Sequence, residues 1–458
     1  MRLRLHGFLH DLPPGPTSFP HFSYEMGKEL YENPLGTLMQ YYEEYGPVFT
    51  LRFLGQEMVF VIGPEANQKI LVDDYRDFSW EEGLYAELIP FIGHGLLTTD
   101  DEDHDRARKL LAPAFYPAQI NSYGEKMVER AVEAVDELSA GELFELHGWT
   151  REVALKIACD VLLGMHTPQH RAEYFAEHFE KGLGYYDGYF WQTLILRGPG
   201  SHQSRMKKHV AKLDEVVKKE IEHRRQWPEG GEAILDMLVH AEADGEKFTP
   251  KEIRDHLVTL MFAGHDTTAA TVSWLFSLIG RYPRVYEKLQ REIDEELDGR
   301  APTADDLFGG MPYLDKVVKE TLRLYPPAWF GPRRARKEFT IYGHRIPANT
   351  HVAYCSWVTH RLPELFENPE GFFPERFTDE NYRALPAGGY VPFGRGPRTC
   401  IGMRFGELEA KILTVVLMQR FGVELFPGQQ FPVRTVPTIS PRNGVKVRLT
   451  AETQGKPE

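Results

Sequence analysis

The clearest chemical feature of the chain is a cysteine in a loop of glycine, proline and arginine. Residues 392–402 read PFGRGPRTCIG, and Cys400 stands just before a helical pattern that runs from Ile401 to Phe421. Glycines in such a loop permit positive φ and close approach of the backbone to another group. A thiolate at a helix N-terminus is stabilised by the helix dipole and by free backbone N–H groups. Cys400 is therefore either an incidental thiol or a ligand held on a special backbone.

The softness of a thiolate limits what Cys400 can bind. Soft ligands prefer iron or copper to magnesium or calcium, and one thiolate alone does not hold a bare ion. It can, however, be the single axial ligand of a haem iron whose other four ligands are porphyrin nitrogens. Haem also needs cations for its propionates, and Arg398 lies two residues before Cys400. An axial ligand of haem is therefore the functional interpretation of Cys400, and an incidental thiol is the alternative.

A second constellation interrupts a long apolar helix predicted from Thr249 to Ile279. Its middle reads AGHDTT, residues 263–268. Glycine weakens a helix interior by about 1 kcal/mol, and a buried carboxylate needs compensation. Gly264 and Thr267 share one face, and the Thr267 hydroxyl can bond back to the carbonyl of Ala263. The stretch is either a helix-packing groove or the wall of a pocket with a proton-donating acid, Asp266, and an alcohol, Thr267.

Charged residues on the helical pattern from Leu314 to Leu324 form a third motif. Glu320 and Arg323 are three residues apart on a helix, close enough for an ion pair. Such pairs are usually exposed and contribute little. Here the helix is otherwise apolar, so burial of the pair is the alternative to exposure. Arg376 would complete a charged network with Glu320 and Arg323 if the fold brought it close.

The elements that carry these motifs indicate one mainly helical domain over residues 1–458. Helical periodicity recurs along most of the chain. β-prone runs are confined to about 48–62, 338–354 and 432–449, and residues 1–22 form an irregular entry segment. No repeat or linker separates independent halves.

Composition excludes several classes of protein. A net charge of −14 argues against a nucleic-acid binder. Three scattered cysteines support neither a disulfide framework nor a four-thiolate zinc site, and a reducing cytoplasm is expected. No apolar run reaches about 18 residues, so no transmembrane segment is expected.

Four signatures in order make the chain similar to the cytochrome P450 family over essentially its whole length. They are the cysteine loop from Phe393 to Gly402, the AGHDTT helix segment, the Glu320/Arg323 pair, and the segment Pro374-Glu375-Arg376-Phe377. The resemblance implies the cytochrome P450 fold and a heme b with Cys400 as axial ligand. It assigns oxygen activation to Gly264, Asp266 and Thr267, and a structural network to Glu320, Arg323 and Arg376.

The resemblance also implies further cofactor-binding residues. Phe393, Arg398 and Gly402 belong to the haem-binding loop. His104 and Arg108 resemble a pair that reaches the haem propionates, and Arg333 resembles another propionate partner, with its neighbour Arg334 as the alternative.

The implied reaction is insertion of one oxygen atom of O2 into a small apolar organic substrate. The segments that line the pocket in this family correspond to aromatic stretches here, including residues 183–191, and a bulky lipid-like, terpenoid-like or fatty-acid-like substrate is expected. The named pocket candidates are Tyr85, Leu88, Trp329, Phe330 and Pro437. A peroxide-driven peroxygenase and a non-catalytic haem-thiolate protein are the alternatives.

Electrons are expected from an external ferredoxin or flavodoxin with its reductase, because no flavin or iron-sulfur domain follows Cys400. A basic patch of arginines and lysines, among them Arg106 and Lys411, would suit such an acidic donor. We expect the protein to be a monomer.

Overall fold

The computed structural model describes residues 12–16, 26–53, 56–141, 143–164, 169–186, 201–226, 231–243 and 245–451. The chain forms two compact units. Unit 1 comprises residues 1–87 and 320–400, and unit 2 comprises residues 88–319 and 401–458. The irregular segment predicted at 1–22 lies outside the described residues except for 12–16.

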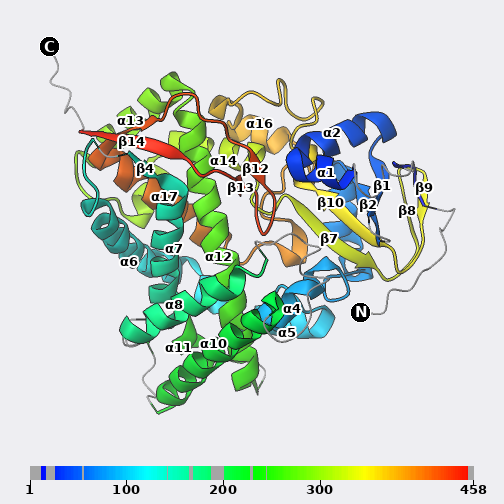
Figure 1. Cartoon of the computed structure of the whole chain (residues 1–458), viewed down its shortest axis with the longest axis horizontal. Coiled ribbons are helices and arrows are strands. Elements are labelled where there is room, and N and C mark those ends of the chain that lie inside the picture. Colours follow the sequence, from blue (N-terminus) through cyan, green and yellow to red (C-terminus); the bar gives the residue numbers. More distant parts are fainter. Residues whose placement is uncertain are drawn as a thin grey trace. The chain divides into compact units, whose positions relative to one another are not determined.

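Unit 1 is built on a five-stranded sheet (Figure 1). Its strands, in spatial order, are β1 (Val48–Phe53), β2 (Gln56–Val61), β10 (His351–Cys355), β7 (Phe330–Ala335) and β3 (Phe78–Ser79). β10 pairs parallel to β2, with Val352 opposite Val59, and the other pairs are antiparallel. A separate hairpin joins β8 (Phe339–Ile341) to β9 (His344–Ile346).

Helices of unit 1 are short. They are α1 (Met26–Glu32), α2 (Pro34–Tyr45), α3 (Pro64–Gln68), α15 (Ser356–Thr359) and α16 (Asp379–Ala384), with a π-helical turn η2 (Lys69–Asp73) and single turns η3 (Tyr75–Asp77), η7 (Pro374–Arg376) and η8 (Gly396–Arg398).

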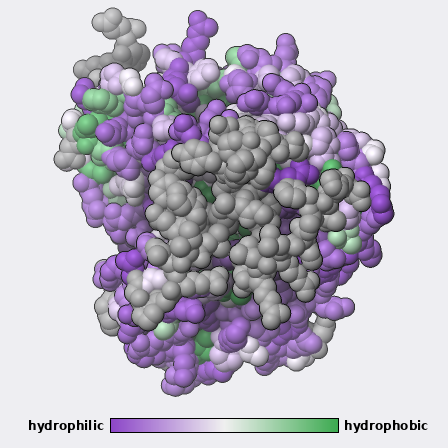
Figure 2. All heavy atoms as spheres, turned by 45° about the vertical axis from the view of Figure 1, so that its right-hand side comes forward, coloured by the Kyte–Doolittle hydropathy of each residue, from purple (hydrophilic) through white to green (hydrophobic). Residues whose placement is uncertain are grey.

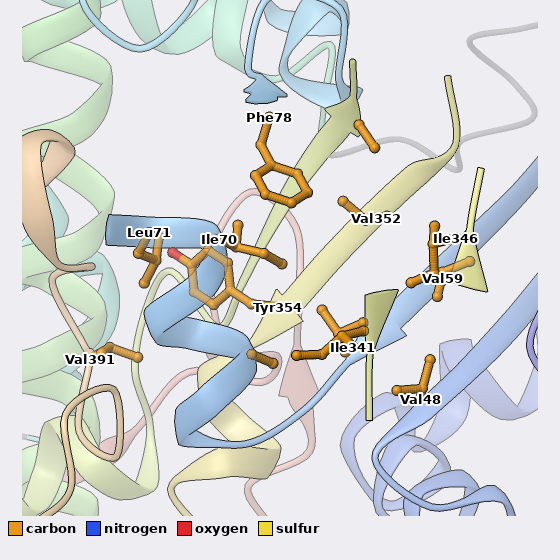
Figure 3. Packing of buried hydrophobic residues seen from close by; sticks show 13 residues of the cluster. Val48, Val59, Ile70, Leu71, Phe78, Ile341, Ile346, Val352, Tyr354 and Val391 are labelled. Atoms are coloured by element: carbon orange, nitrogen blue, oxygen red, sulfur yellow. The ribbon is translucent and has the colours of Figure 1, made fainter. Parts of the chain in front are cut away.

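The core of unit 1 ties the sheet to the region of the cysteine loop. Figure 3 shows valine and isoleucine side chains of the strands packed together with Ile70 and Leu71 of η2 and with Val391. Alternate strand residues such as Val59 and Val61 face this core, as the two-residue strand period requires. Because Val391 immediately precedes the cysteine loop, the sheet core anchors the start of that loop.

Unit 2 is mainly helical. Its helices are α4 (Ile89–Ile92), α5 (Asp101–Leu111), α6 (Pro117–Asp136), α7 (Leu146–Leu163), α8 (Gln169–Leu183), α10 (His202–Arg224), α11 (Ile234–His240), α12 (Pro250–Ile279), α13 (Pro283–Leu297) and α17 (Met403–Arg420). Short turns η4 (Leu84–Leu88), η5 (Ala112–Phe115) and η6 (Asp306–Gly310) occur between them, and α14 (Pro312–Leu324) contributes residues to both units. α7 packs along α12, the longest of these helices (Figure 1).

The strands of unit 2 form small sheets. β4 (Leu143–Glu145), β11 (Phe421–Leu425) and β14 (Lys446–Ala451) lie in the order β11-β14-β4. Two short hairpins pair β5 (Glu242–Ala243) with β6 (Glu246–Lys247), and β12 (Val433–Arg434) with β13 (Ser440–Pro441). The predicted fold class, mainly α with a small β-rich part, is confirmed.

Local sequence explains where α12 starts. Thr249 Oγ1 accepts a hydrogen bond from Glu252 N at 3.2 Å, and Glu252 Oε2 accepts one from Thr249 N at 2.7 Å. This reciprocal capping box, with Pro250 at the first helical position, satisfies backbone donors that the helix itself leaves free. The helix then runs 30 residues and ends at Ile279, as its apolar pattern predicts.

The hydrophilic surface agrees with the content of charged residues, which is 26% of the chain. The face in Figure 2 is mostly hydrophilic outside the grey atoms, with small scattered hydrophobic areas. Within the described part of the chain, no helix combines the length and the apolar character that a membrane span requires.

Candidate functional site

The cysteine loop in unit 1 presents an exposed thiol on a constrained backbone. Cys400 N donates to Phe393 O at 2.9 Å, and Thr399 N donates to Gly396 O at 3.0 Å. Gly394 and Gly396 have φ of 68° and 73°, a region that favours glycine. A Cβ on Gly396 would also lie 2.5 Å from Leu71 O, so η2 leaves no room for a side chain there.

Cys400 differs from the other two cysteines in exposure. Cys159 and Cys355 are buried, whereas Cys400 is exposed. Burial raises the pKa of the Cys355 thiol to about 12 and raises the pKa of Cys159 further. Both buried thiols therefore stay protonated at neutral pH and are poor ligands, which leaves Cys400 as the accessible one.

Two of the predicted propionate partners in unit 1 share one aromatic ring. Arg333 Cζ lies 3.2 Å and Arg398 Cζ 4.4 Å from the centroid of the Trp80 indole. Tyr85 stacks on Trp80 with a centroid separation of 5.1 Å and an interplanar angle of 14°. Successive strand residues point to opposite faces, so Arg334, the alternative, is directed away from the face that Arg333 occupies.

Trp80 is the residue in this group that no sequence motif indicates. A tryptophan face attracts guanidinium groups, and here it orders two arginines, one from strand β7 and one from the cysteine loop. No pattern in the sequence links Trp80 to either arginine.

Unit 2 contains a notch in the middle of α12. The helix is buried along most of its second half, yet Ala263 is exposed and Gly264 and Thr267 are half-buried. Thr267 Oγ1 donates to Ala263 O at 2.7 Å, the back-bond that the sequence predicted. A Cβ on Gly264 would meet no atom within 4 Å, so the notch is open space next to a hydroxyl.

Asp266 is adjacent to the notch in sequence, but its side chain contacts other elements of unit 2. Its side chain is 3% exposed, and its Oδ1 lies 3.3 Å from Arg151 Nε and 3.7 Å from Arg434 Nη2. Thr438 Oγ1 donates to Asp266 Oδ2 at 2.5 Å. Burial alone would raise the pKa of the Asp266 carboxyl, but Arg434, the Thr438 hydroxyl and Arg151 together lower it below the ordinary aspartate value.

The other predicted cofactor residues of unit 2 lie on two helices. His104 and Arg108 are four residues apart on α5, hence on one face, and His104 is buried with its Nδ1 3.3 Å from Asp105 Oδ1. Gly402 is the residue that precedes α17. A Cβ on Gly402 would have its nearest neighbour at 3.9 Å, so the start of α17 carries no bulk.

The charged network in unit 1 is buried. Arg323 forms a two-point ion pair with Glu320, with Nε–Oε2 at 2.7 Å and Nη2–Oε1 at 2.9 Å, and both side chains are fully buried. Arg376 Nε joins at 2.9 Å from Glu320 Oε1. Arg323 also donates to the carbonyls of His360, Pro369 and Gly371. The network therefore fastens α14 to the chain segment that leads toward the cysteine loop.

The pocket candidates are divided between the two units. Tyr85, Trp329 and Phe330 belong to unit 1, where Trp329 and Phe330 contact with ring centroids 4.1 Å apart. Leu88 and Pro437 belong to unit 2 and are half-buried. The aromatic stretch at 187–191 lies outside the described residues.

These groups fit a flat, anionic, thiolate-ligated macrocycle. Unit 1 offers an exposed thiol and two ordered arginines for carboxylates. Unit 2 offers backbone surfaces without side-chain bulk at Gly264, Gly402 and Gly406. At Gly406, a Cβ would have Thr268 Oγ1 as its nearest neighbour, at 3.8 Å. Within each unit, these residues have the chemistry that a haem would require.

Comparison with known proteins gives the same result. Cyclooctatin synthase of Streptomyces melanosporofaciens is 30% identical over 412 residues, covering 86% of both chains. Pentalenene oxygenase of Streptomyces avermitilis is 28% identical over 396 residues, covering 86% of this chain and 88% of its own. The solved structure of cyanobacterial CYP120A1 with bound retinoic acid is 27% identical, with a TM-score of 0.84 and coverage of 96% and 99%. The family model for cytochrome P450 matches residues 13–447, and the chain therefore belongs to the cytochrome P450 family.

Proposed function

We propose that this cytochrome P450 binds heme b through the Cys400 thiolate and hydroxylates a bulky, apolar, terpenoid-like substrate with one oxygen atom of O2. The observation that carries the proposal is the notch on α12. Helix α12 is buried along most of its second half, but at Ala263 and Gly264 its small residues leave a gap, and the Thr267 hydroxyl lies beside this gap. Such a gap leaves room for a small ligand next to a proton-bearing group.

Several residues would hold the cofactor. Cys400 would bind the iron, and Arg398 and Arg333 of unit 1, with His104 and Arg108 of unit 2, would face the propionates. Phe393 would support the loop through the bond from Cys400 N to its carbonyl, and Gly402 would leave its backbone uncovered. When bound, the haem iron supplies oxygen binding and activation.

The protein's own contribution is to position groups and manage protons. Thr267 carries a hydroxyl whose proton already bonds to Ala263 O, so its oxygen is free to accept a second hydrogen bond in the notch. Asp266 is the neighbouring acid and is paired with two arginines. The Thr267 oxygen would accept a hydrogen bond from a water in the notch and hold that water in place, and Asp266 would be the acid that supplies protons to it.

The substrate class rests on the relatives and on the candidate pocket residues. Similar proteins include cyclooctatin synthase, pentalenene oxygenase and a solved structure with bound retinoic acid. The pocket candidates are aromatic or aliphatic, which suits an apolar molecule of similar bulk. Tyr85, Leu88, Trp329, Phe330 and Pro437 are the residues proposed to contact it.

Electrons would come from an external donor such as a ferredoxin or a flavodoxin. Two members of the expected basic patch offer no uncompensated charge to it. Arg106 forms ion pairs with Glu246 and Glu252, and Lys411 is buried and paired with Asp315. The other cations of that patch would have to attract the donor.

The proposal is tested with purified holoprotein, a surrogate ferredoxin system and a panel of terpenoid hydrocarbons, retinoids and fatty acids. We expect a terpenoid or retinoid to shift the haem absorption and to yield a product with one ¹⁸O from ¹⁸O2. The reduced carbon monoxide complex should show a thiolate-type band that Cys400→Ser abolishes. Oxygen incorporation only from peroxide would instead favour a peroxygenase, and no turnover with any donor would favour a non-catalytic haem protein.

A further inference from the structure

Helix α5 in unit 2 carries two predicted propionate partners but has little apolar surface to hold it in place. His104 and Arg108 lie four residues apart, on one face. Of the 11 residues of α5, the buried apolar ones are Ala107, Leu110 and Leu111. Because burial of apolar area is the main force that docks a surface helix, this short helix depends on polar contacts as well.

Arg106 supplies several of these contacts. It lies on α5 between His104 and Arg108, and its side chain reaches the β5–β6 hairpin and the start of α12. Arg106 Nη1 donates to Glu252 Oε1 at 2.6 Å, and Nη2 donates to Lys247 O at 2.8 Å. Arg106 Nε donates to a carboxylate oxygen of Glu246. A guanidinium presents its donors in a rigid fork, so three acceptors fix its position closely.

An aromatic ring covers the same guanidinium. Arg106 Cζ lies 5.5 Å from the centroid of the Phe248 ring, and Phe248 is buried. The imidazole of His256 on α12 lies on Phe248 in turn, with ring centroids 4.7 Å apart. Burial lowers the pKa of His256 to about 4, so this imidazole is neutral near pH 7 and does not repel Arg106. Phe248 therefore joins α5 to α12 through packing, next to the hydrogen bonds.

Glu252 has two tasks at once. Its Oε2 accepts from Thr249 N at 2.7 Å in the capping box of α12, while its Oε1 accepts from Arg106. Burial alone would raise the pKa of the Glu252 carboxyl, but the bonds from Thr249 and Arg106 lower it below the ordinary glutamate value. The carboxylate is thus ionised at neutral pH, and it links the first turn of α12 directly to α5.

The start of α12 is itself fixed to other elements of unit 2. Arg254 Nη2 donates to Phe91 O at 3.2 Å, and Asp255 Oδ2 accepts from His94 N at 3.0 Å. Arg106 therefore fastens α5 to a part of α12 that is already held by its neighbours. A flexible attachment would not fix the direction of α5, whereas this one does.

We propose that Arg106 is a positioning residue, which holds α5 against the β5–β6 hairpin and the start of α12 and so keeps His104 and Arg108 directed toward the haem propionates. The inference rests on the proposed binding of haem. It gives Arg106 a different task from the docking of an electron donor, because the charge of Arg106 is already met by two carboxylates.

The test uses the full-length holoprotein and three variants. Arg106→Gln removes both the charge and the fork, whereas Arg106→Lys keeps the charge but cannot meet three acceptors with the same geometry. Glu252→Gln removes the charge that faces Arg106 but keeps an oxygen for Thr249 N, since glutamine also serves in a capping box. Lys109→Gln is the matched control, because it removes one positive charge from the same helix.

The first measurement is hydrogen–deuterium exchange of the backbone amides of residues 101–111, followed by mass spectrometry. We expect several-fold faster exchange in Arg106→Gln and Arg106→Lys than in the parent and Lys109→Gln, because α5 would open more often. Glu252→Gln should change in the same direction and covers the case in which Arg106→Gln does not fold. Exchange at the parent rate in Arg106→Lys and Glu252→Gln would overturn the positioning role.

The second measurement is the rate of haem transfer to apomyoglobin. It should rise roughly threefold to tenfold in both Arg106 variants and stay at the parent value in Lys109→Gln, in keeping with the modest strength of a partly exposed ion-pair network. Faster exchange of α5 with unchanged haem transfer would show that the link from α5 to the propionates is wrong.

A contact with the electron donor would give a different pattern. Arg106→Lys would then behave as the parent in exchange and in haem transfer, and Arg106→Gln would lower only the affinity for a surrogate ferredoxin. That pattern would overturn the proposal. If the parent binds no haem at all, the proposed function fails, while the exchange measurement still decides whether Arg106 holds α5.

Discussion

The guanidinium of Arg333 lies against the indole of Trp80, with Arg333 Cζ 3.2 Å from the ring centroid. Arg333 is buried, and Arg398 shares the same ring at 4.4 Å. Two cations that repel each other are thus held close by one aromatic side chain, an arrangement that favours an anionic partner nearby.

We therefore predict that Trp80→Ala weakens haem retention, whereas Trp80→Phe, which keeps an aromatic face, weakens it less. A buried cation–π contact contributes about 2 kcal/mol, equivalent to a roughly 30-fold change in the haem dissociation rate if fully lost. Transfer of haem to apomyoglobin measures that rate. Equal rates for the parent and Trp80→Ala would contradict the role given to Trp80.

A second prediction concerns the buried network at Glu320. Removing one partner of a fully buried ion pair leaves an uncompensated charge and costs about 3–5 kcal/mol. Glu320→Gln should therefore lower the free energy of unfolding by an amount in this range, because Arg323 and Arg376 both lose their carboxylate. Denaturant unfolding of the holoprotein measures it.

The exposed pair Arg383–Asp379 provides the control. Its side chains are 80% and 91% exposed, and Asp379→Asn should change the free energy of unfolding by less than about 1 kcal/mol. Similar losses for the two variants would show that burial does not strengthen the Glu320 network.

The sequence predicted elements whose signals are local. The capping box of Thr249 and Glu252 with Pro250 marks the start of α12, and the back-bond from Thr267 to Ala263 follows from helix spacing. Strand β7 (Phe330–Ala335) lies before the β-rich range predicted at 338–354, so the prediction did not include it. Its sequence contains Pro332 and two arginines, which obscure the usual strand pattern.

Contacts distant along the chain could not be predicted in this way. The spacing of Glu320 and Arg323 does not decide whether the pair is exposed or buried, since the helical spacing is the same in both cases. The partners of Asp266 come from α7 and from the C-terminal hairpin, and neither Arg151 nor Thr438 stands in any recognisable pattern with Asp266. Only the packing of the folded helices and the hairpin reveals them.

A third prediction separates stability from activity at Gly264. Glycine in a helix interior costs up to about 1 kcal/mol relative to alanine, and a Cβ on Gly264 meets no protein atom within 4 Å. Gly264→Ala should therefore raise the free energy of unfolding of the apoprotein slightly, yet lower product formation several-fold, because the methyl group enters the notch. Denaturant unfolding and turnover assays check the two halves.

Gly396→Ala is the contrasting variant. Its φ is 73°, and its new Cβ would lie 2.5 Å from Leu71 O, so this substitution should destabilise the protein. Unchanged turnover for Gly264→Ala would show that open space at the notch has no functional use. A gain in stability for Gly396→Ala would show that the positive φ and the contact with Leu71 O do not require glycine there.

The last prediction is a loss of stability in acid that depends on His360. Its Nε2 accepts a hydrogen bond from Val391 N at 2.9 Å, and burial, with Arg323 and Arg361 nearby, lowers its pKa to about 3. The unfolded chain takes up a proton near pH 6.5, whereas folded His360 stays neutral. Above pH 6.5 both states are neutral and His360 contributes no pH dependence. Below it, the contribution of His360 to stability should fall by about 1.4 kcal/mol per pH unit until the folded group titrates near pH 3. The buried His256 and His265, whose pKa values burial lowers to about 4, add to the total slope. His360→Asn should therefore make the slope shallower by about 1.4 kcal/mol per pH unit in urea unfolding measured between pH 4 and 7, while substitution of the exposed His94 by asparagine should leave it unchanged. A slope that His360→Asn does not change would mean that other groups carry the acid sensitivity.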